Sequence, residues 1–276
     1  MDSRYGSACG LRSRNPSRHA TASPGLRRRY LRIAMPVAVV SDIHGNLTAL
    51  DAVIADLERR GVERVLHGGD LALAGGQGAE VIDRIRELGW PGVVGNTDEL
   101  LWRPQEREAQ LERAPKLKTL LDLIFDRYAP ATLEQIGPER LAWLERLPSE
   151  QRLDGLLVLH ASPDDLWRAP MADAGGEELA RTYASCGAEV VVYGHIHRPF
   201  VRRLDAITIA NSGSVGAPYD GDPRASYVLA DEGELEVIRV EYDIEREIGL
   251  LLRSQYPGRA QIAEMRRRGT YVAPAT

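Results

Sequence analysis

The stretch VAVVSDIHGN at residues 37–46 decides the fold. It opens with four consecutive aliphatic residues, which is typical of a strand buried on both faces. Polar residues follow at once, and residues 46–61, NLTALDAVIADLERRG, then repeat apolar side chains at helical spacing. A buried strand that leads directly into an amphipathic helix predicts the first half of a β–α–β unit.

The same alternation continues along the chain. It predicts further strands at 64–70, 92–96, 155–160 and 189–195, and further helices at 79–89 and near 175–186. Because β–α–β connections are right-handed crossovers between parallel strands, we expect at least three parallel strands in an α/β fold.

Two other regions have a different pattern. Residues 98–150 are polar and helical in pattern and contain five prolines, which predicts a helical insertion. Period-2 alternation later predicts antiparallel strands at 200–204, 206–211, 226–231 and 234–242. We therefore expect one domain over residues 35–243 with an insertion at 98–150, followed by a helical, partly basic tail at 244–276.

Residues 1–34 carry eight arginines, no lysine and a single acidic residue, without apolar periodicity. This composition predicts a disordered leader. It also resembles a transit peptide, but no clear amphipathic helix is present. We favour a third interpretation, in which Met35 is the native start of the protein.

Charge and cysteine content narrow the function classes. Of the chain's 35 basic and 40 acidic residues, 27 and 39 lie beyond residue 34, a net charge of −12 for that part. Such a body repels a phosphate backbone, so we expect no stable complex with duplex nucleic acid. No apolar run is long enough to span a membrane, and only two cysteines are present. A cytoplasmic protein is therefore expected.

Side chains that bind metal ions follow five of the predicted strands. They are Asp42 and His44 after the first strand, Asp70 after the second, Asn96 after the third, His160 after the fourth, and His195 and His197 after the fifth. Four of the six histidines in the chain fall at these positions. Ligands of open α/β sheets bind beyond the carboxyl ends of the strands, so these residues predict one shared site.

The residue types indicate which ions the site would hold. Asp42 and His44 are two residues apart, as are His195 and His197, so in extended backbone each pair points the same way. Asp, Asn and His without thiolates suit Mn²⁺, Fe or Zn²⁺ better than Ca²⁺ or an iron–sulfur cluster. Seven donors exceed the need of one ion but suffice for two with a bridging carboxylate, an arrangement typical of phosphoryl transfer.

The ordered motifs resemble those of the calcineurin-like metallophosphoesterases, in particular a branch of small bacterial and archaeal phosphodiesterases. The motifs are SDIHGN (41–46), GGD (68–70), GN (95–96), His160, GHIH (194–197) and NSGSVG (211–216). The resemblance covers roughly Pro36 to Tyr242 and leaves out the leader and the tail.

The resemblance implies a four-layer αββα sandwich with mixed sheets and a site for two divalent metal ions, with manganese expected first. The implied ligands are Asp42, His44 and His197 for one ion, Asn96, His160 and His195 for the other, and Asp70 for both. It further implies that a hydroxide between the ions attacks phosphorus in line with the leaving group. Asp70, Asn96 and His195 are accordingly our expected catalytic residues.

One position departs from the family pattern. Many relatives have a histidine after the motif asparagine, where it stabilises the transition state or protonates the leaving oxygen, and this chain has Thr97. A threonine hydroxyl is a poor acid near neutral pH, so general-acid assistance is expected to be weak.

Other polar residues near the motifs have two interpretations each. Arg198 and Arg224 are candidates for substrate binding, and solvated arginines are the alternative. For His67 a core position is favoured over a place in the site. Asp98 is expected to cap a helix, with ligand orientation as the alternative, and Trp167 is expected to pack rather than stack on a base.

Together these observations predict a metal-dependent phosphodiesterase acting on a small or nucleotide-like substrate. A phosphomonoesterase or protein phosphatase is an alternative, although GGDLALAGG lacks the Asp-Arg-Gly of the protein phosphatases. A non-catalytic scaffold, like a retromer subunit of similar fold, is another, but a scaffold needs no intact ligand set. The net charge disfavours a nuclease for long substrates. The sequence makes no prediction of the oligomeric state.

Overall fold

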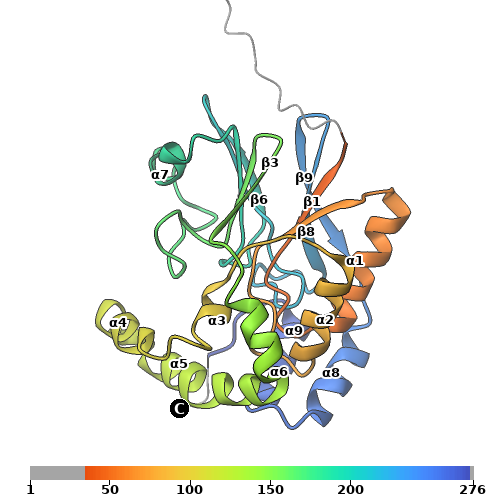
Figure 1. Cartoon of the computed structure of the whole chain (residues 1–276), viewed down its shortest axis with the longest axis vertical. Helices are drawn as coiled ribbons and strands as arrows, with labels where there is room; N and C mark the ends of the chain where they lie inside the picture. The colour runs from red at the N-terminus through yellow and green to blue at the C-terminus, as the bar shows by residue number, and fades with distance from the viewer. Residues whose placement is uncertain (1–34, 274–276) are drawn as a thin grey trace, which may run out of the picture. The chain divides into compact units, whose positions relative to one another are not determined.

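Two mixed β-sheets lie face to face in the computed structural model, which describes residues 35–273 (Figure 1). The first sheet has the strand order β2-β1-β8-β9 and the second the order β3-β4-β5-β7-β6. The strands of the first sheet are β1 (Val37–Val40), β2 (Arg64–His67), β8 (Ala225–Asp231) and β9 (Glu234–Val240). Those of the second are β3 (Glu150–Leu153), β4 (Leu156–Leu159), β5 (Val190–Tyr193), β6 (Phe200–Arg203) and β7 (Thr208–Asn211).

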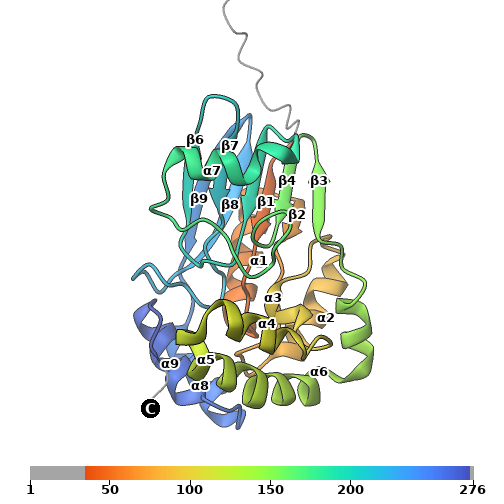
Figure 2. The ribbon, with the colours of Figure 1, turned by 90° about the vertical axis from the view of Figure 1, so that its left-hand side faces the viewer.

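Helices cover the outer face of each sheet. The helices α1 (Leu47–Arg60), α2 (Gly78–Leu88) and α8 (Ile244–Arg253) lie on the side of the first sheet, and α7 (Gly176–Tyr183) lies over the second (Figures 1 and 2). The order of layers is helix, sheet, sheet, helix, and the expected αββα sandwich with mixed sheets is therefore confirmed.

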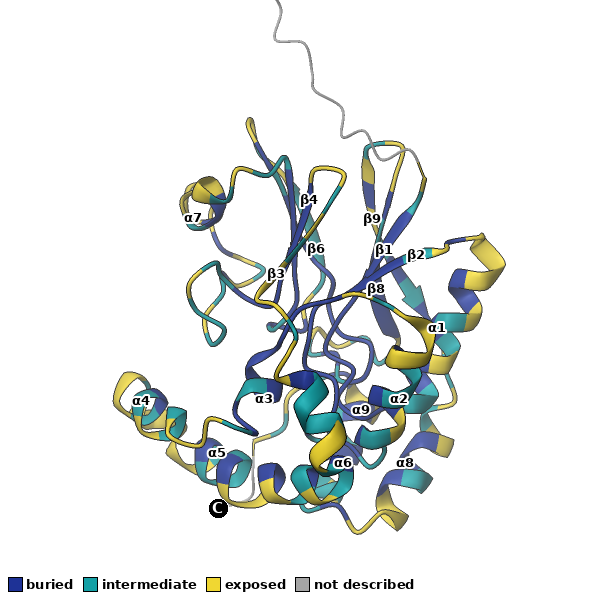
Figure 3. Ribbon diagram, viewed as in Figure 1, coloured by how far each residue is buried: buried dark blue, intermediate teal, exposed yellow. Residues whose placement is uncertain are grey.

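The alternating side chains of β1 show why its sequence is apolar throughout. Val37 and Val39 are buried in the core between the two sheets. Ala38 and Val40 point the other way, into the core beneath the helices. Because both faces of the strand are covered, no position tolerates a polar side chain. Figure 3 shows the same burial along both sheets, with exposed residues concentrated on the helices and turns.

Strand pairing agrees with most of the predicted pattern. β1 pairs with β2 in parallel, and β4, β5 and β7 are parallel neighbours in the second sheet. β6 pairs antiparallel to β7, and β8 antiparallel to both β9 and β1, as the alternation at the end of the chain indicated.

The predicted strand at 92–96 is wrong. This segment forms a single parallel bridge, between Gly92 and His67, and the short helix α3 (Asn96–Glu99) begins at its end. The amide of Val94 donates to the carbonyl of Pro148 rather than to a strand, which ends the ladder. The edge strand β3 was not predicted, because its sequence EQRL is polar and half-exposed and has no apolar run.

Helices of the predicted insertion follow α3 and contribute buried residues to the same core as α1 and α2. They are α4 (Glu106–Arg113), the short turn η1 (Pro115–Leu117), α5 (Lys118–Leu123), the wider turn η2 (Ile124–Tyr128) and α6 (Ala129–Leu144). α6 packs against α2, and its own axis breaks at Gly137, which has a φ of 66° before Pro138. A glycine is required there because that φ is unfavourable for other residues.

The residues after 243 are an integral part of this body. α8 and α9 (Arg259–Arg268) pack on each other, and Ile248, Leu251, Tyr256 and Ile262 are buried in the same core as α1. The tail therefore shares the core of the domain, although it lies outside the motif series. The leader expected at residues 1–34 lies outside the described residues. No helix among residues 35–273 is both long and apolar enough to cross a membrane.

A buried hydrogen bond ties α1 to the first sheet. The hydroxyl of Tyr227 in β8 donates to the carboxylate of Asp56 in α1, at 2.8 Å. Burial works against ionisation of Asp56, but this bond and the bonds from Arg60 and Arg59 outweigh it and lower the pKa of the carboxyl. A carboxyl whose pKa is lowered by folding stabilises the fold above its ordinary pKa, and this contribution is lost as the pH falls through the lowered value.

We expect Tyr227→Phe to lower the free energy of unfolding by about 1 kcal/mol near neutral pH, because a buried hydrogen bond to a carboxylate is removed. The difference should shrink in acid, where Asp56 is protonated. Urea denaturation at both pH values measures it. Tyr271→Phe, at an exposed tyrosine, is the control and should change stability by less than about 0.5 kcal/mol. An unchanged difference in acid would contradict the role assigned to Asp56.

Candidate metal centre

The loops that follow β1, β2, β4 and β5 meet the start of α3 at one end of the two sheets. The structure brings all seven predicted ligand residues together there, although they span more than 150 positions of sequence. Four of them, Asp42, His44, Asp70 and His197, are buried and each offers one ligand atom within 4.8 Å of the other three.

Within this four-residue group, each carboxylate lies close to the imidazole of a histidine. Nε2 of His197 lies 3.1 Å from Oδ1 of Asp42. Nε2 of His44 lies 3.7 Å from Oδ2 of Asp70. Two carboxylates and two imidazoles at such distances are a donor set that suits a borderline divalent ion.

The other three residues form a second group beside the first. Oδ1 of Asn96 lies 2.8 Å from Nε2 of His160 and 3.0 Å from Nδ1 of His195. Nε2 of His160 in turn lies 3.6 Å from Oδ1 of Asp70. The carboxylate of Asp70 thus has one oxygen near His44 and the other near His160, so it stands between the two groups.

Backbone carbonyls fix the orientation of three imidazoles. The Nδ1–H groups of His44, His160 and His197 donate to the carbonyls of Leu73, Gly68 and Ala217, respectively, at 2.8, 2.8 and 2.5 Å. Such bonds leave Nε2 of a neutral ring unprotonated and available as a ligand.

Two of these nitrogens face each other. Nε2 of His44 and Nε2 of His197 are 3.2 Å apart, and two lone pairs at that distance repel unless a proton or a cation is shared between them. The chemistry of the donor set therefore fits a bound cation.

The backbone at this site is strained. Five of the seven residues, Asp42, His44, Asp70, His195 and His197, have φ values between 49° and 65°. A non-glycine residue in this region costs about 1–3 kcal/mol. Strain at five such positions persists only because the surrounding core holds the backbone in place. The strained residues are the same residues whose side chains converge at the site.

Two motif glycines make room for the carboxylates. A Cβ at Gly95 would lie 2.0 Å from Oδ1 of Asp70, and a Cβ at Gly194 would lie 2.3 Å from Oδ2 of Asp42. Any side chain at either position would displace a carboxylate, which explains why glycine precedes both Asn96 and His195.

Asp98 fixes the position of Asp70. Its carboxylate accepts the amides of Asp70 and Leu71 at 2.8 and 3.0 Å, and the amide of Gly95 at the start of α3 at 3.1 Å. The amide of Thr97 donates to Oδ1 of Asp70 at 2.9 Å. Burial, together with the nearby charge of Asp70, raises the pKa of Asp98 to about 6. Asp98 therefore both caps the helix, as expected, and orients the loop that carries Asp70.

Burial favours the neutral form of two of the histidines, His44 and His195. It lowers the pKa of His195 to about 4, and it lowers the pKa of His44, with the neighbouring His197 acting in the same direction. A neutral imidazole is the form that binds a metal ion, so little proton release is needed at these two positions.

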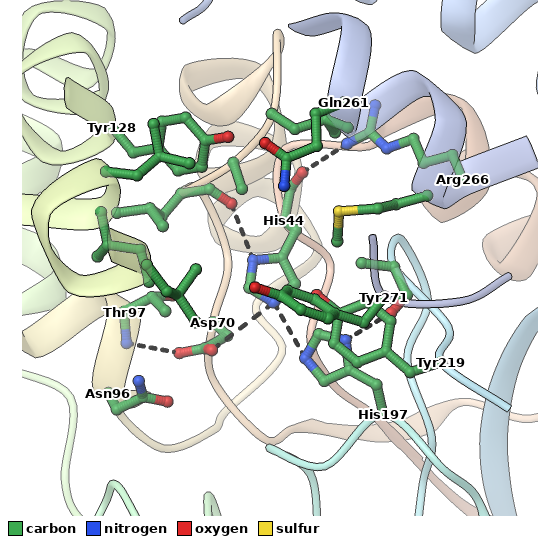
Figure 4. Close-up of a pocket in the computed structure, with 18 of the residues that line it drawn as sticks. His44, Asp70, Asn96, Thr97, Tyr128, His197, Tyr219, Gln261, Arg266 and Tyr271 are labelled. Atoms are coloured by element: carbon green, nitrogen blue, oxygen red, sulfur yellow. Dashed lines mark hydrogen bonds and ion pairs between the residues drawn. The ribbon is translucent and has the colours of Figure 1, made fainter. Parts of the chain in front are cut away.

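A cavity of about 360 Å³ opens beside the metal centre (Figure 4). Five of the predicted ligands line one end of it: His44, Asp70, Asn96, His195 and His197. The insertion supplies one wall, from α5 and η2, and the C-terminal segment supplies another, from α9 and Tyr271. Thr97 also lines the cavity, and its buried hydroxyl has no hydrogen-bond partner.

The structure does not bring the two predicted substrate-binding arginines to this cavity. Arg224 is exposed and pairs with Asp222 at 2.6 Å. Arg198 is also exposed, and its Nε donates to the carbonyl of Tyr219. Neither residue lines the cavity, so the structure gives no support to a role in substrate binding.

Two other residues, His67 and Trp167, are packed against neighbouring residues, which was the favoured interpretation of each. The ring of His67 is fully buried against Gly92, and burial lowers its pKa to about 4. The ring of Trp167 stacks on Phe125 with centroids 6.0 Å apart. Neither lines the cavity.

The structure adds cavity residues that the sequence did not reveal. Tyr128, Tyr219, Arg266 and Tyr271 line the cavity, and Arg266 is fully buried. Its guanidinium contacts Glu247 and donates to the carbonyl of His44 at 2.8 Å. In the sequence, Arg266 belongs to the basic run Arg266–Arg268, which reads as the exposed face of a tail, and the apolar spacing of α9 was the only signal of burial.

Comparison with known proteins identifies the family of this chain. The model of the calcineurin-like phosphoesterase superfamily domain matches residues 35–234. An uncharacterized protein from Methanocaldococcus jannaschii is 31% identical over 248 residues, which cover 80% of this chain and 93% of that protein.

Two solved structures are similar over 86% of this chain and their whole length. A metallophosphoesterase from Sphaerobacter thermophilus has 25% identity and a TM-score of 0.69. A hypothetical protein from Pyrococcus horikoshii has 21% identity and a TM-score of 0.71, and shares the fold. With a family model that matches most of the chain and a buried Asp/His cluster that could hold a metal ion, this chain belongs to the calcineurin-like phosphoesterase superfamily.

Proposed function

We propose that this protein is a phosphodiesterase that requires two divalent metal ions and acts on small phosphoesters. The observation that carries the proposal is the position of Asp70, whose two carboxylate oxygens face different groups of donors. A carboxylate shared in this way is typical of two-metal sites that act at phosphorus.

The residues present fit two cations. Asp42, His44 and His197 would hold one, Asn96, His160 and His195 the other, and Asp70 would contact both. Mn²⁺ is our first expectation, with Fe and Zn²⁺ as alternatives. Bound cations would neutralise the phosphate oxygens and lower the pKa of water, which is the chemistry that ester hydrolysis needs.

The chain's own groups have positioning roles. The amide of Thr97 and the carboxylate of Asp98 hold Asp70 from two sides. The cavity next to the donors leaves room for an organic group esterified to the phosphate.

A non-catalytic scaffold explains the site less well. The strained backbone at five donor residues costs stability, and a protein that served only as a platform would gain nothing in return. Strain of this kind is retained where a particular geometry of side chains is needed.

We expect hydrolysis of bis-p-nitrophenyl phosphate in the presence of Mn²⁺ and its loss with a chelator. Asp70→Ala should lower kcat/KM by at least about 100-fold, since even loss of an outer partner of a metal ligand costs about 10–100-fold. Release of p-nitrophenolate measures both. Asp205→Ala, at an exposed loop residue, is the control and should retain activity. If no divalent ion supports turnover, the proposed function is rejected.

We expect Asp98→Asn to weaken Mn²⁺ binding by about 10–100-fold, because one acceptor oxygen that holds the Asp70 loop becomes an amide group. Isothermal titration calorimetry of the metal-free protein with Mn²⁺ provides the measurement. Asp205→Asn is the matched control for the same chemical change. Equal affinities of the two variants would show that Asp98 does not orient the metal centre.

Thr97 generates a prediction about leaving groups. Because a hydroxyl at this position is a poor acid, rates with aryl methyl phosphodiesters should fall steeply as the pKa of the leaving phenol rises. Steady-state kinetics across such a series, with a pre-steady-state experiment to establish that chemistry limits the rate, tests this. A flat dependence would show that another group donates the proton.

A further inference from the structure

Beyond the metal centre, the walls of the cavity are mostly apolar, and Thr97 and Gln261 are uncharged polar residues in the same lining. Apolar and aromatic side chains come from three regions, namely the loop after β2, the insertion, and the segment from residue 217 to the C-terminal part. They include Leu73, Leu120, Leu123, Ile124, Ile262 and Met265. Figure 4 shows Tyr128 on one side of the site and Tyr219 and Tyr271 on the other.

Charged side chains are scarce in the same lining. Among the described residues that line the cavity, the only Asp, His or Arg outside the predicted ligands is Arg266. Its charge is already balanced, because the guanidinium forms an ion pair with Glu247 in which the side chains are 1% and 0% exposed. A second guanidinium nitrogen donates to the carbonyl of His44, and Nε is buried without a hydrogen-bond partner. Because Glu247 balances its charge, Arg266 brings no net positive charge to the cavity.

This lining selects against substrates with additional charge. A second phosphate or a carboxylate placed in the cavity would lose its hydration and meet no free cation among residues 35–273. Burying an unpaired charge is costly, whereas burying an apolar group is favourable in proportion to its area. The walls thus distinguish between substituents of the same size but different charge.

We infer that the substrate is a phosphodiester with a single phosphate, one of whose substituents is an uncharged, predominantly apolar aryl or alkyl group that binds in this cavity. The inference deepens the proposed function and rests on it for the reaction, but not for the binding preference. The cavity volume of about 360 Å³ is in the range of ligand pockets that bury most of a small organic group. Nucleoside polyphosphates, which carry several anionic groups, are disfavoured.

The inference is tested with diesters that share p-nitrophenol as the leaving group and differ in the second substituent. Methyl, hexyl, phenyl and p-carboxyphenyl esters form the series. We expect kcat/KM for the phenyl or hexyl ester to exceed that for the methyl ester by about tenfold or more, as burial of a large apolar side chain does. We expect kcat/KM for the p-carboxyphenyl ester to be at least about tenfold lower than kcat/KM for the phenyl ester. The phenyl-to-hexyl ratio shows whether a ring or a chain is preferred.

Equal rates across the series, or a preference for the carboxylated ester, would overturn the inference while leaving the phosphodiesterase function in place. Absence of turnover with every ester would instead reject the proposed function.

Charged substitutions in the wall test the location. Met265→Lys places an ammonium group in the cavity on a side chain of similar length, and should lower the ratio of phenyl to p-carboxyphenyl kcat/KM by about tenfold or more. Met171→Lys makes the same change at an exposed residue outside the cavity lining and should leave the ratio unchanged. Leu123→Lys, with Leu117→Lys as its exposed control, repeats the test on the opposite wall if Met265→Lys does not fold.

A binding measurement separates the preference from catalysis. Calorimetry of the Mn²⁺-loaded protein with phenylphosphonate, methylphosphonate and p-carboxyphenylphosphonate should show the tightest binding for phenylphosphonate. Binding of this ligand should also have the more negative heat-capacity change, which marks burial of apolar surface. If all three bind equally, or if p-carboxyphenylphosphonate binds best, the cavity is not an apolar subsite.

Discussion

The carboxylate of Asp70 has to stand between two groups of donors, and much of the surrounding structure serves this one requirement. Gly95 lacks a side chain because a Cβ there would meet the carboxylate. Thr97 holds one carboxylate oxygen through its amide, and Asp98 holds the amide of Asp70 itself. Asp70 also has a left-handed φ of 56°. Three residues at the start of α3, Gly95, Thr97 and Asp98, and a strained loop after β2 therefore serve the position of a single side chain.

The layered core holds the strained backbone of this site in place. Strain at five donor residues amounts to several kcal/mol if each contributes about 1–3 kcal/mol. The strands that precede these residues are buried on both faces, so the strand ends cannot relax independently. Hydrogen bonds from imidazoles to backbone carbonyls then fix which nitrogen of each ring faces the site. Because the sheets are rigid, the loops at their ends hold the donor side chains at defined positions.

The chemistry and the specificity of the site come from different parts of the chain. The donors follow the strands of the two sheets, whereas most of the cavity wall comes from α5, η2, α9 and Tyr271. Arg266 joins the two parts, because it is fully buried in α9 and donates to the carbonyl of His44. Under the proposed function, a change in the insertion or in the C-terminal segment would alter which substituent fits while the candidate metal centre keeps its donors.

The sequence by itself determined the layered α/β fold and the set of converging donor residues. Buried parallel strands have a recognisable apolar pattern, and their carboxyl ends must meet at one edge of the sheet. Asn96 could be assigned to the site in this way even though its strand was wrong, because Gly95 and Asn96 end the extended segment in either case. The pattern could not show that Val94 would pair with Pro148, since this depends on a loop far along the chain.

Only the tertiary structure decided what surrounds the donors. From their place beside the motifs, Arg224 and Arg198 were candidates for substrate binding, with solvated arginines as the alternative. In the structure they contact Asp222 and the carbonyl of Tyr219 outside the cavity. Arg266 belongs to the tail that was predicted only as helical and partly basic, yet its side chain is buried against Glu247. Local spacing reports which face of an element is apolar, whereas the partner of a charged side chain depends on elements brought together by folding. The residues at the strand ends could therefore be predicted from the sequence, whereas the walls of the cavity could not.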